Sequence, residues 1–102
     1  MHDLVCFCCQ QSAEKYLKAV LNEQGLTAPR THNLENLLNL LPSQPRLAAL
    51  RPGLKFLIQF AIEPRYPGFR SSKRQATAAL RWVAKVRQAC RNLLGLRVGK
   101  RP

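Results

Sequence analysis

Hydrophobic residues in the first quarter of the chain recur with the spacing of an amphipathic helix. With a turn of about 100° per residue, apolar side chains gather on one arc and polar side chains on the other. Asp3 can cap the start of such a helix, and Gly25 is the type of residue that ends one. The pattern predicts a helix over residues 3–24. Its apolar arc contains Cys6, Cys9, Ala13, Tyr16, Leu17, Val20 and Leu21, and its polar side contains Gln11, Glu14, Lys15 and Lys18.

The middle of the chain carries two shorter apolar patterns. Leucines at 34, 37, 38 and 41 have the i, i+3, i+4, i+7 spacing of a helix over residues 33–41, which ends before Pro42. Thr31, His32 or Asn33 can cap it. Apolar residues at 47, 50, 54, 57, 58 and 62 then predict a helix over residues 44–62. We expect this helix to be interrupted or kinked at Pro52-Gly53.

The last helix has the strongest pattern. Ser72 and Gln75 have the spacing of a capping box, and Gly95 can end the helix, so we predict a helix over residues 72–94. Its apolar arc contains Ala76, Ala79, Val83, Val86, Cys90, Leu93 and Leu94. No segment alternates with the period of a strand. The predicted fold class is therefore all-α, an antiparallel up-down helical bundle.

Positive charge is concentrated in the second half of the chain. The 102 residues suffice for one domain, and the net charge is +12. Up to Arg51, five basic and four acidic residues give +1, whereas the twelve basic residues beyond it meet only Glu63 and give +11. One side of the last helix contains Arg70, Lys73, Arg74, Arg81, Lys85, Arg87 and Arg91. Such a face can bind phosphates or can simply be a solvated surface.

A bend is predicted between the last two helices, in Glu63-Pro64-Arg65-Tyr66-Pro67-Gly68-Phe69. The prolines fix backbone angles, and Gly68 tolerates the positive φ of a tight turn. The chain must therefore reverse here and present Arg65 and Tyr66. An architectural interpretation remains open, in which Tyr66 packs under the bend and Arg65 pairs with Glu63 or a helix C-terminus.

Three segments resemble the HEPN domain, a small helical module of prokaryotes and higher eukaryotes. They are Phe7-Cys8-Cys9-Gln10-Gln11-Ser12-Ala13-Glu14-Lys15, Thr31-His32-Asn33-Leu34 and Arg65-Tyr66-Pro67. The resemblance implies a HEPN-like bundle over residues 1–96, followed by a basic flexible tail over 97–102. HEPN domains typically have another long helix before the first segment, so the bundle is expected to be N-terminally truncated. Either a start codon lies upstream, or the uncovered apolar face around Leu4 and Phe7 is hidden in a dimer.

The resemblance also directs attention to catalysis and binding. HEPN ribonucleases have an arginine followed, after four to six residues, by a histidine near the last helix. Here the histidines are His2 and His32, and Arg30 precedes His32 by only two positions. The motif is absent, so we assign no catalytic residue and expect His32 to cap or pack. The predicted nucleotide- or phosphate-binding residues are Arg65, Tyr66, Arg70, Arg74, Arg81 and Lys85.

The remaining features favour no metal, cofactor or membrane. Cys6 and Cys9 lie in the apolar arc, so we expect core packing rather than zinc binding, and we expect Cys90 to pack in the same way. The sequence shows neither a signal peptide nor a membrane span, which predicts a cytoplasmic protein.

The combined prediction is a non-catalytic module that binds a nucleotide, RNA or other nucleic acid. The resemblance implies a homodimer and a nucleotidyltransferase partner, as in toxin-antitoxin pairs. Two alternatives stay open. One is a ribonuclease toxin with a non-standard site, such as Arg65, Tyr66 and His32 in a dimer groove. The other is a structural accessory subunit that binds an acidic protein.

Overall fold

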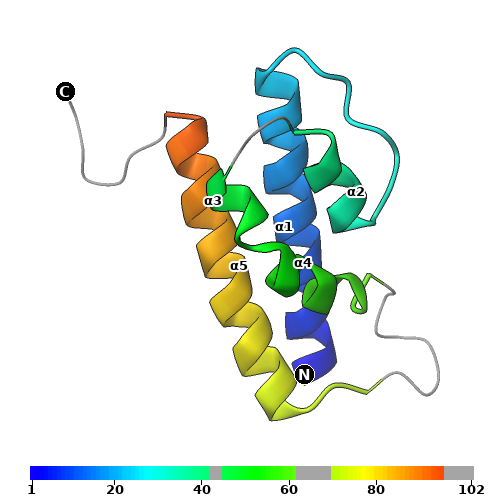
Figure 1. The fold of residues 1–102 in the computed structure, drawn as a ribbon. Helices are drawn as coiled ribbons and strands as arrows, with labels where there is room; N and C mark the ends of the chain where they lie inside the picture. Colours follow the sequence, from blue (N-terminus) through cyan, green and yellow to red (C-terminus); the bar gives the residue numbers. More distant parts are fainter. Residues whose placement is uncertain (42–44, 62–69, 96–102) are drawn as a thin grey trace.

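The computed structural model describes residues 1–41, 45–61 and 70–95, and every regular element in these ranges is a helix. The elements are α1 (His2–Glu23), α2 (Leu34–Asn39), α3 (Pro45–Ala48), α4 (Arg51–Ile58) and α5 (Lys73–Leu93) (Figure 1). The predicted all-α bundle is confirmed. The bend with Arg65 and Tyr66 and the basic tail over residues 97–102 lie outside the described residues, so those predictions stay open.

The two ends of α1 differ in how well the sequence predicted them. Asp3 does not cap the helix, because the helix begins one residue earlier and Asp3 lies in its first turn. There its negative charge interacts favourably with the positive end of the helix dipole. The C-terminus follows the prediction. Gly25 has a φ of 78°, and the amide of Leu26 donates to the carbonyl of Leu21 at 2.9 Å, which is the hydrogen bond of a Schellman motif.

The middle helices show how local chemistry sets their boundaries. Of the three predicted caps for α2, Asn33 is the one used, because its side chain accepts hydrogen bonds from the amides of Glu35 and Asn36. The predicted break between residues 44 and 62 occurs between α3 and α4. Pro52 does not interrupt a helix. It lies in the first turn of α4, where a missing amide proton costs nothing.

The start of α5 has the predicted capping box. Ser72 Oγ accepts from the amide of Gln75 at 3.0 Å, and the amide of Ser72 donates to Gln75 Oε1 at 2.9 Å. At the other end, Gly95 has a φ of 79°. Both ends of this helix are thus fixed by the residues that predicted them.

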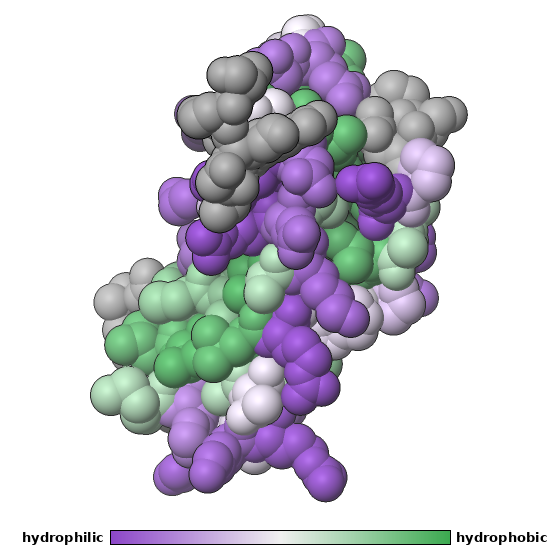
Figure 2. All heavy atoms as spheres, turned by 90° about the vertical axis from the view of Figure 1, so that its left-hand side faces the viewer, coloured by the Kyte–Doolittle hydropathy of each residue, from purple (hydrophilic) through white to green (hydrophobic). Residues whose placement is uncertain are grey.

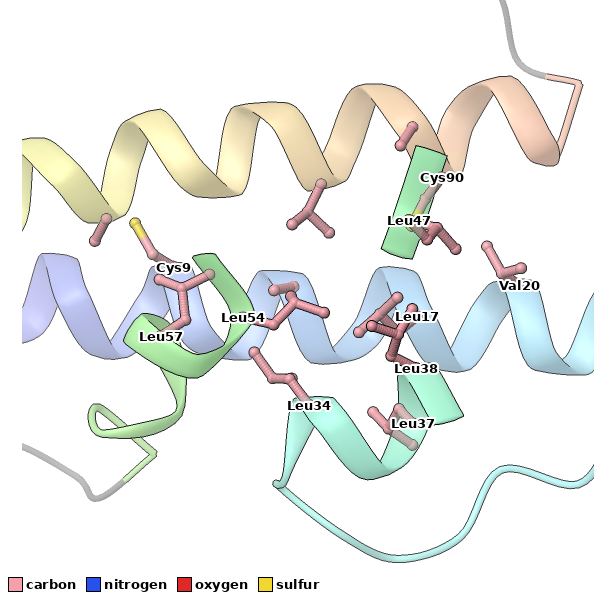
Figure 3. Packing of buried hydrophobic residues seen from close by; sticks show 14 of the residues in the cluster. Cys9, Leu17, Val20, Leu34, Leu37, Leu38, Leu47, Leu54, Leu57 and Cys90 are labelled. Atoms are coloured by element: carbon pink, nitrogen blue, oxygen red, sulfur yellow. The ribbon is translucent and has the colours of Figure 1, made fainter. Parts of the chain in front are cut away.

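The helices pack as an up-down bundle. The two long helices lie side by side and run in the same direction, because the chain returns between them through α3 and α4 (Figure 1). The returning segment packs across both helices, so Leu57 lies near Cys9 at one end of the core and Leu47 near Cys90 at the other (Figure 3). Helix α2 packs on α1 and α4.

The predicted core is largely confirmed. Cys6, Cys9, Leu17, Leu38 and Cys90 are buried, whereas Lys15, Arg74 and Arg81 are exposed. Val83 is only half-buried, and Leu4 is 50% exposed. Within the described ranges, none of the helices combines the length and the apolar character that a membrane crossing needs.

Candidate functional site

The basic face of α5 is formed by Arg74, Arg81 and Lys85. Helix geometry places the three side chains within about 40° of one another and spreads them over about 16 Å of the axis. All three are exposed, as is Arg70 just before the helix. The structure therefore brings together four of the six predicted binding residues on one element or next to it. The other two, Arg65 and Tyr66, lie outside the described residues and stay a prediction.

No acidic side chain neutralises this face in the part of the chain that the structure describes. The ion pairs found there are Lys18–Glu14, His32–Glu14 and Arg51–Glu35, none of which involves α5. Exposed cations on one helix face repel each other and attract a line of anions. Arginine guanidinium groups can also bind phosphate oxygens in a bidentate manner. The face has the chemistry of a phosphate-binding surface.

Trp82 is the aromatic residue nearest to this face, and its ring is already used. It packs on the backbone of Gly53 in α4, so closely that a Cβ atom at position 53 would overlap the indole. Lys85 Nζ lies 5.2 Å from the ring centroid, within the range of a cation–π contact. Stacking of bases on Trp82 is therefore disfavoured, and electrostatic contact with phosphates is the better match to this face.

A second polar cluster lies on α1, centred on the carboxylate of Glu14. Glu14 Oε2 accepts from Lys18 Nζ at 2.9 Å, and Glu14 Oε1 lies 2.8 Å from His32 Nδ1. The neighbouring Gln10 is fully buried and donates through Nε2 to the carbonyl oxygen of His32 at 3.0 Å. These bonds fasten the segment before α2 onto α1.

The burial of Glu14 corrects the sequence analysis, which placed this residue on the polar side of the helix. Glu14 is only 7% exposed. Burial alone would raise the pKa of its carboxyl group, but hydrogen bonds from His32 and Lys18 outweigh that effect and lower the pKa. The predicted Glu14–Lys18 pair is confirmed. The helical position of Glu14, one turn before Lys18 and beside the Leu17–Leu21 edge of the apolar arc, was the available signal for its burial.

His32 has the arrangement of an oriented histidine. Its Nδ1 is held by a buried carboxylate, and its side chain is 67% exposed. A carboxylate on one nitrogen fixes the ring and leaves the other nitrogen free for proton transfer. However, the segment that leads into α2 lies on the opposite side of α1 from α5 (Figure 1). Within one chain, His32 and the basic face of α5 do not form a common site.

The cysteines behave as core residues where they are buried. Burial raises the pKa of Cys9 to about 11 and that of Cys90 to about 12, and it also raises the pKa of Cys6. Buried thiols with raised pKa values remain protonated and unreactive near neutral pH. The packing role predicted for Cys6, Cys9 and Cys90 is confirmed by their burial. Cys8 is exposed.

One of three comparisons with known proteins identifies the family of this helical bundle. Neither the curated proteins nor the solved structures gave a match to the chain. The sequence model of the HEPN domain matches residues 1–93, which include the helices α1 to α5 of the described residues and the polar cluster around Glu14. The chain therefore belongs to the HEPN domain family, which relates it to nucleotide- and RNA-linked functions.

Proposed function

We propose that this protein is a non-catalytic HEPN module that binds nucleotides or single-stranded RNA through the phosphates. The observation that carries the proposal is the exposed row of Arg74, Arg81 and Lys85, which no acidic residue pairs with in the described part of the chain. Arg70 is also exposed, two residues before the N-cap of α5. We also propose Arg65 and Tyr66, which lie outside the described residues, as phosphate-binding residues on the basis of the family resemblance.

The absence of a standard proton-transfer group supports binding without cleavage. The sequence has two histidines, and neither follows an arginine at the family's ribonuclease spacing. His32 lies on the side of α1 away from the basic face of α5. A surface of this kind holds phosphate through cations but has no histidine to move the proton.

The test is the salt dependence of binding to fluorescently labelled, unstructured RNA. The plot of log affinity against log salt has a negative slope, and each lost phosphate contact should make it less steep by about 0.7. Replacing Arg74, Arg81 and Lys85 together by Gln should therefore make it less steep by about 2. A matched control replaces Lys15, Arg46 and Lys55 by Gln. These residues are also exposed and the charge change is the same, but none lies on α5. Equal losses in the two triple variants would refute the assignment of the surface.

The oriented His32 supports one alternative, a ribonuclease with a non-standard site. Its Nδ1 contact with Glu14 is the observation in favour. Incubation of purified protein with RNA decides between the two functions. We expect no cleavage. Cleavage by the parent protein that is lost in both His32→Ala and Arg65→Ala would establish the alternative and contradict non-catalytic binding.

We further propose that the module acts with a nucleotidyltransferase, as in toxin-antitoxin pairs, and that it forms a homodimer. Both proposals rest on the family resemblance. Co-expression with a small nucleotidyltransferase, followed by size-exclusion chromatography, tests the first. Sedimentation of the purified chain tests the second.

A further inference from the structure

An apolar groove lies between α1 and α5, on a face that the middle helices do not cover. Its volume is about 360 Å³ and its wall is apolar. Cys8, which lines it, lies about 160° around α1 from Gln10, whose side chain contacts the segment before α2. The groove therefore opens away from α2. Its lining residues are Leu4, Val5, Cys8, Cys9, Ser12, Leu80 and Val83.

The groove is exposed to an unusual degree for an apolar surface. Leu4 is 50% and Leu80 is 54% exposed, one on each side of it. Figure 2 shows the resulting hydrophobic area directly beside a column of hydrophilic side chains. An apolar wall offers a phosphate neither positive charge nor hydrogen-bond donors. Apolar side chains of another protein, in contrast, are stabilised when they pack against it and leave water. The chemistry of the groove is thus that of a protein contact, separate from the basic face of α5.

The charges at the ends of the groove determine which protein surface fits. Lys73 and Arg87 lie seven residues before and after Leu80, so they continue its side of α5, and both are exposed. On α1, the exposed Lys15 follows Ser12 by one turn. Among the described acidic residues, Asp3 is half-buried and lies about 180° around α1 from Ser12, and Glu23 lies about three turns beyond Ser12. The rim is therefore basic.

We propose that this groove docks an amphipathic helix of a partner protein, with an apolar ridge in the groove and Glu or Asp residues along its edges. The space between two side-by-side helices suits the ridge of a third helix. Acidic edges complement Lys15, Lys73 and Arg87. A second copy of this chain is a poor occupant, because it brings the same basic rim and a net charge of +12 toward itself. The proposed homodimer would then use another surface.

Synthetic peptides test this without knowledge of the natural partner. The first is a helical peptide of about five turns with leucines on one face and glutamates along its edges. The second has lysines in place of the glutamates, and the third keeps the glutamates but has serines in place of the leucines. Fluorescence anisotropy of labelled peptides measures their binding to the full chain. The first should bind about tenfold or more tighter than the other two, since both the apolar and the charged contacts are needed.

Two protein variants locate the binding. Leu80→Asp should weaken binding of the first peptide about tenfold, as loss of a central apolar contact usually does. Leu40→Asp is the matched control, because Leu40 is also exposed, at 47%, but lies at the end of α2. Circular dichroism checks that both variants fold. Arg87→Glu should shift the preference toward the lysine peptide.

Three results would overturn the proposal. Equal binding of the glutamate and lysine peptides would remove the charge argument. Binding that Leu80→Asp and Leu40→Asp affect equally would place the contact elsewhere. Self-association of the parent chain that Leu80→Asp abolishes would make a second copy the occupant. None of these results bears on RNA binding by Arg74, Arg81 and Lys85, so a failure here is distinct from a failure of the proposed function.

Discussion

Glu14 carries its negative charge at a position where burial alone would favour the neutral acid. The charge is stable there because His32 Nδ1 and Lys18 Nζ both lie within hydrogen-bonding distance of its oxygens. Gln10 Nε2 donates a further hydrogen bond, to the backbone carbonyl oxygen of His32. A paired and hydrogen-bonded carboxylate of this kind couples the stability of the fold to its protonation.

Replacement of Glu14 should therefore have an effect that depends on pH. We expect Glu14→Gln to lower the free energy of unfolding by about 1–3 kcal/mol at neutral pH, because it replaces the buried, charged acceptor of the His32 and Lys18 hydrogen bonds by a neutral amide. The folded-state pKa of Glu14 lies below its ordinary value of 4.5, so the unfolded chain takes up the proton first. The stabilisation is complete above that ordinary value and is lost as the pH falls through the folded-state pKa.

Urea unfolding at neutral and at acidic pH measures this difference. The gap between the parent and Glu14→Gln should shrink in acid. Glu35→Gln is the control, since Glu35 pairs with Arg51 at 3.1 Å but is 25% exposed, and its loss should cost about 1 kcal/mol or less. A gap that does not change with pH would show that the Glu14 charge does not stabilise the fold.

Gly53 gives a prediction whose sign is diagnostic. Replacing a glycine inside a helix by alanine ordinarily stabilises a protein by about 0.5–1 kcal/mol. Here the added Cβ would overlap the ring of Trp82, which is half-buried between α4 and α5. We expect Gly53→Ala to destabilise by about 1–3 kcal/mol instead, as overpacking does. Thermal unfolding followed by circular dichroism measures it. A stabilised variant would mean that Trp82 can move aside freely.

At the scale of the helices, the sequence predicted those features that depend on near neighbours in the chain. Gly25, the Ser72–Gln75 capping box and the leucines of α2 act over three or four residues, so their effects could be predicted from spacing. Pro52 was harder. The prediction was an interruption at Pro52-Gly53, whereas Pro52 lies in the first turn of α4. Glycine fits at position 53 because the ring of Trp82 leaves no room there for a Cβ atom. Trp82 lies 29 positions away in the sequence, so spacing could not predict this contact.

The capping box of α5 has a measurable contribution. Ser72→Ala removes the acceptor of the Gln75 amide and should lower the free energy of unfolding by about 1 kcal/mol. Thr77→Ala is the control, because Thr77 is exposed in the interior of the same helix, where alanine is equally well or better tolerated. Urea unfolding compares the two. Equal losses would show that Ser72 does not act as a cap in solution.

At the scale of the whole molecule, α5 has three sides with different environments. One packs in the core through Ala79, Val86 and Cys90, one carries the basic face, and one lines the apolar groove. The sequence indicated the first two, because core and charged positions separate by helical period. The groove could be expected only in outline. Its place depends on α1 and α5 lying side by side, which requires the tertiary arrangement, and Phe7, expected in the uncovered face, does not line it.

Two adjacent surfaces that both bind negatively charged ligands should influence each other through charge alone. The glutamate peptide in the groove would lie close to the basic face of α5 without covering it, at a separation comparable with the Debye length of about 8–10 Å. We therefore expect saturating peptide to weaken RNA binding a few-fold at low salt, and the effect to fade as salt is added. Linkage requires RNA to weaken peptide binding by the same factor.

Leu80→Gln separates this coupling from direct competition. The variant should bind RNA as the parent does, because Leu80 is uncharged and lies off the basic face, and its RNA affinity should no longer respond to the peptide. RNA binding is again followed by fluorescence anisotropy, with the serine peptide as the control for added negative charge in solution. If the glutamate peptide displaces RNA completely at every salt concentration, the two ligands share one site, and the separation of the basic face from the groove is wrong. A weakening that salt removes and Leu80→Gln abolishes requires instead that both surfaces of α5 be occupied at once.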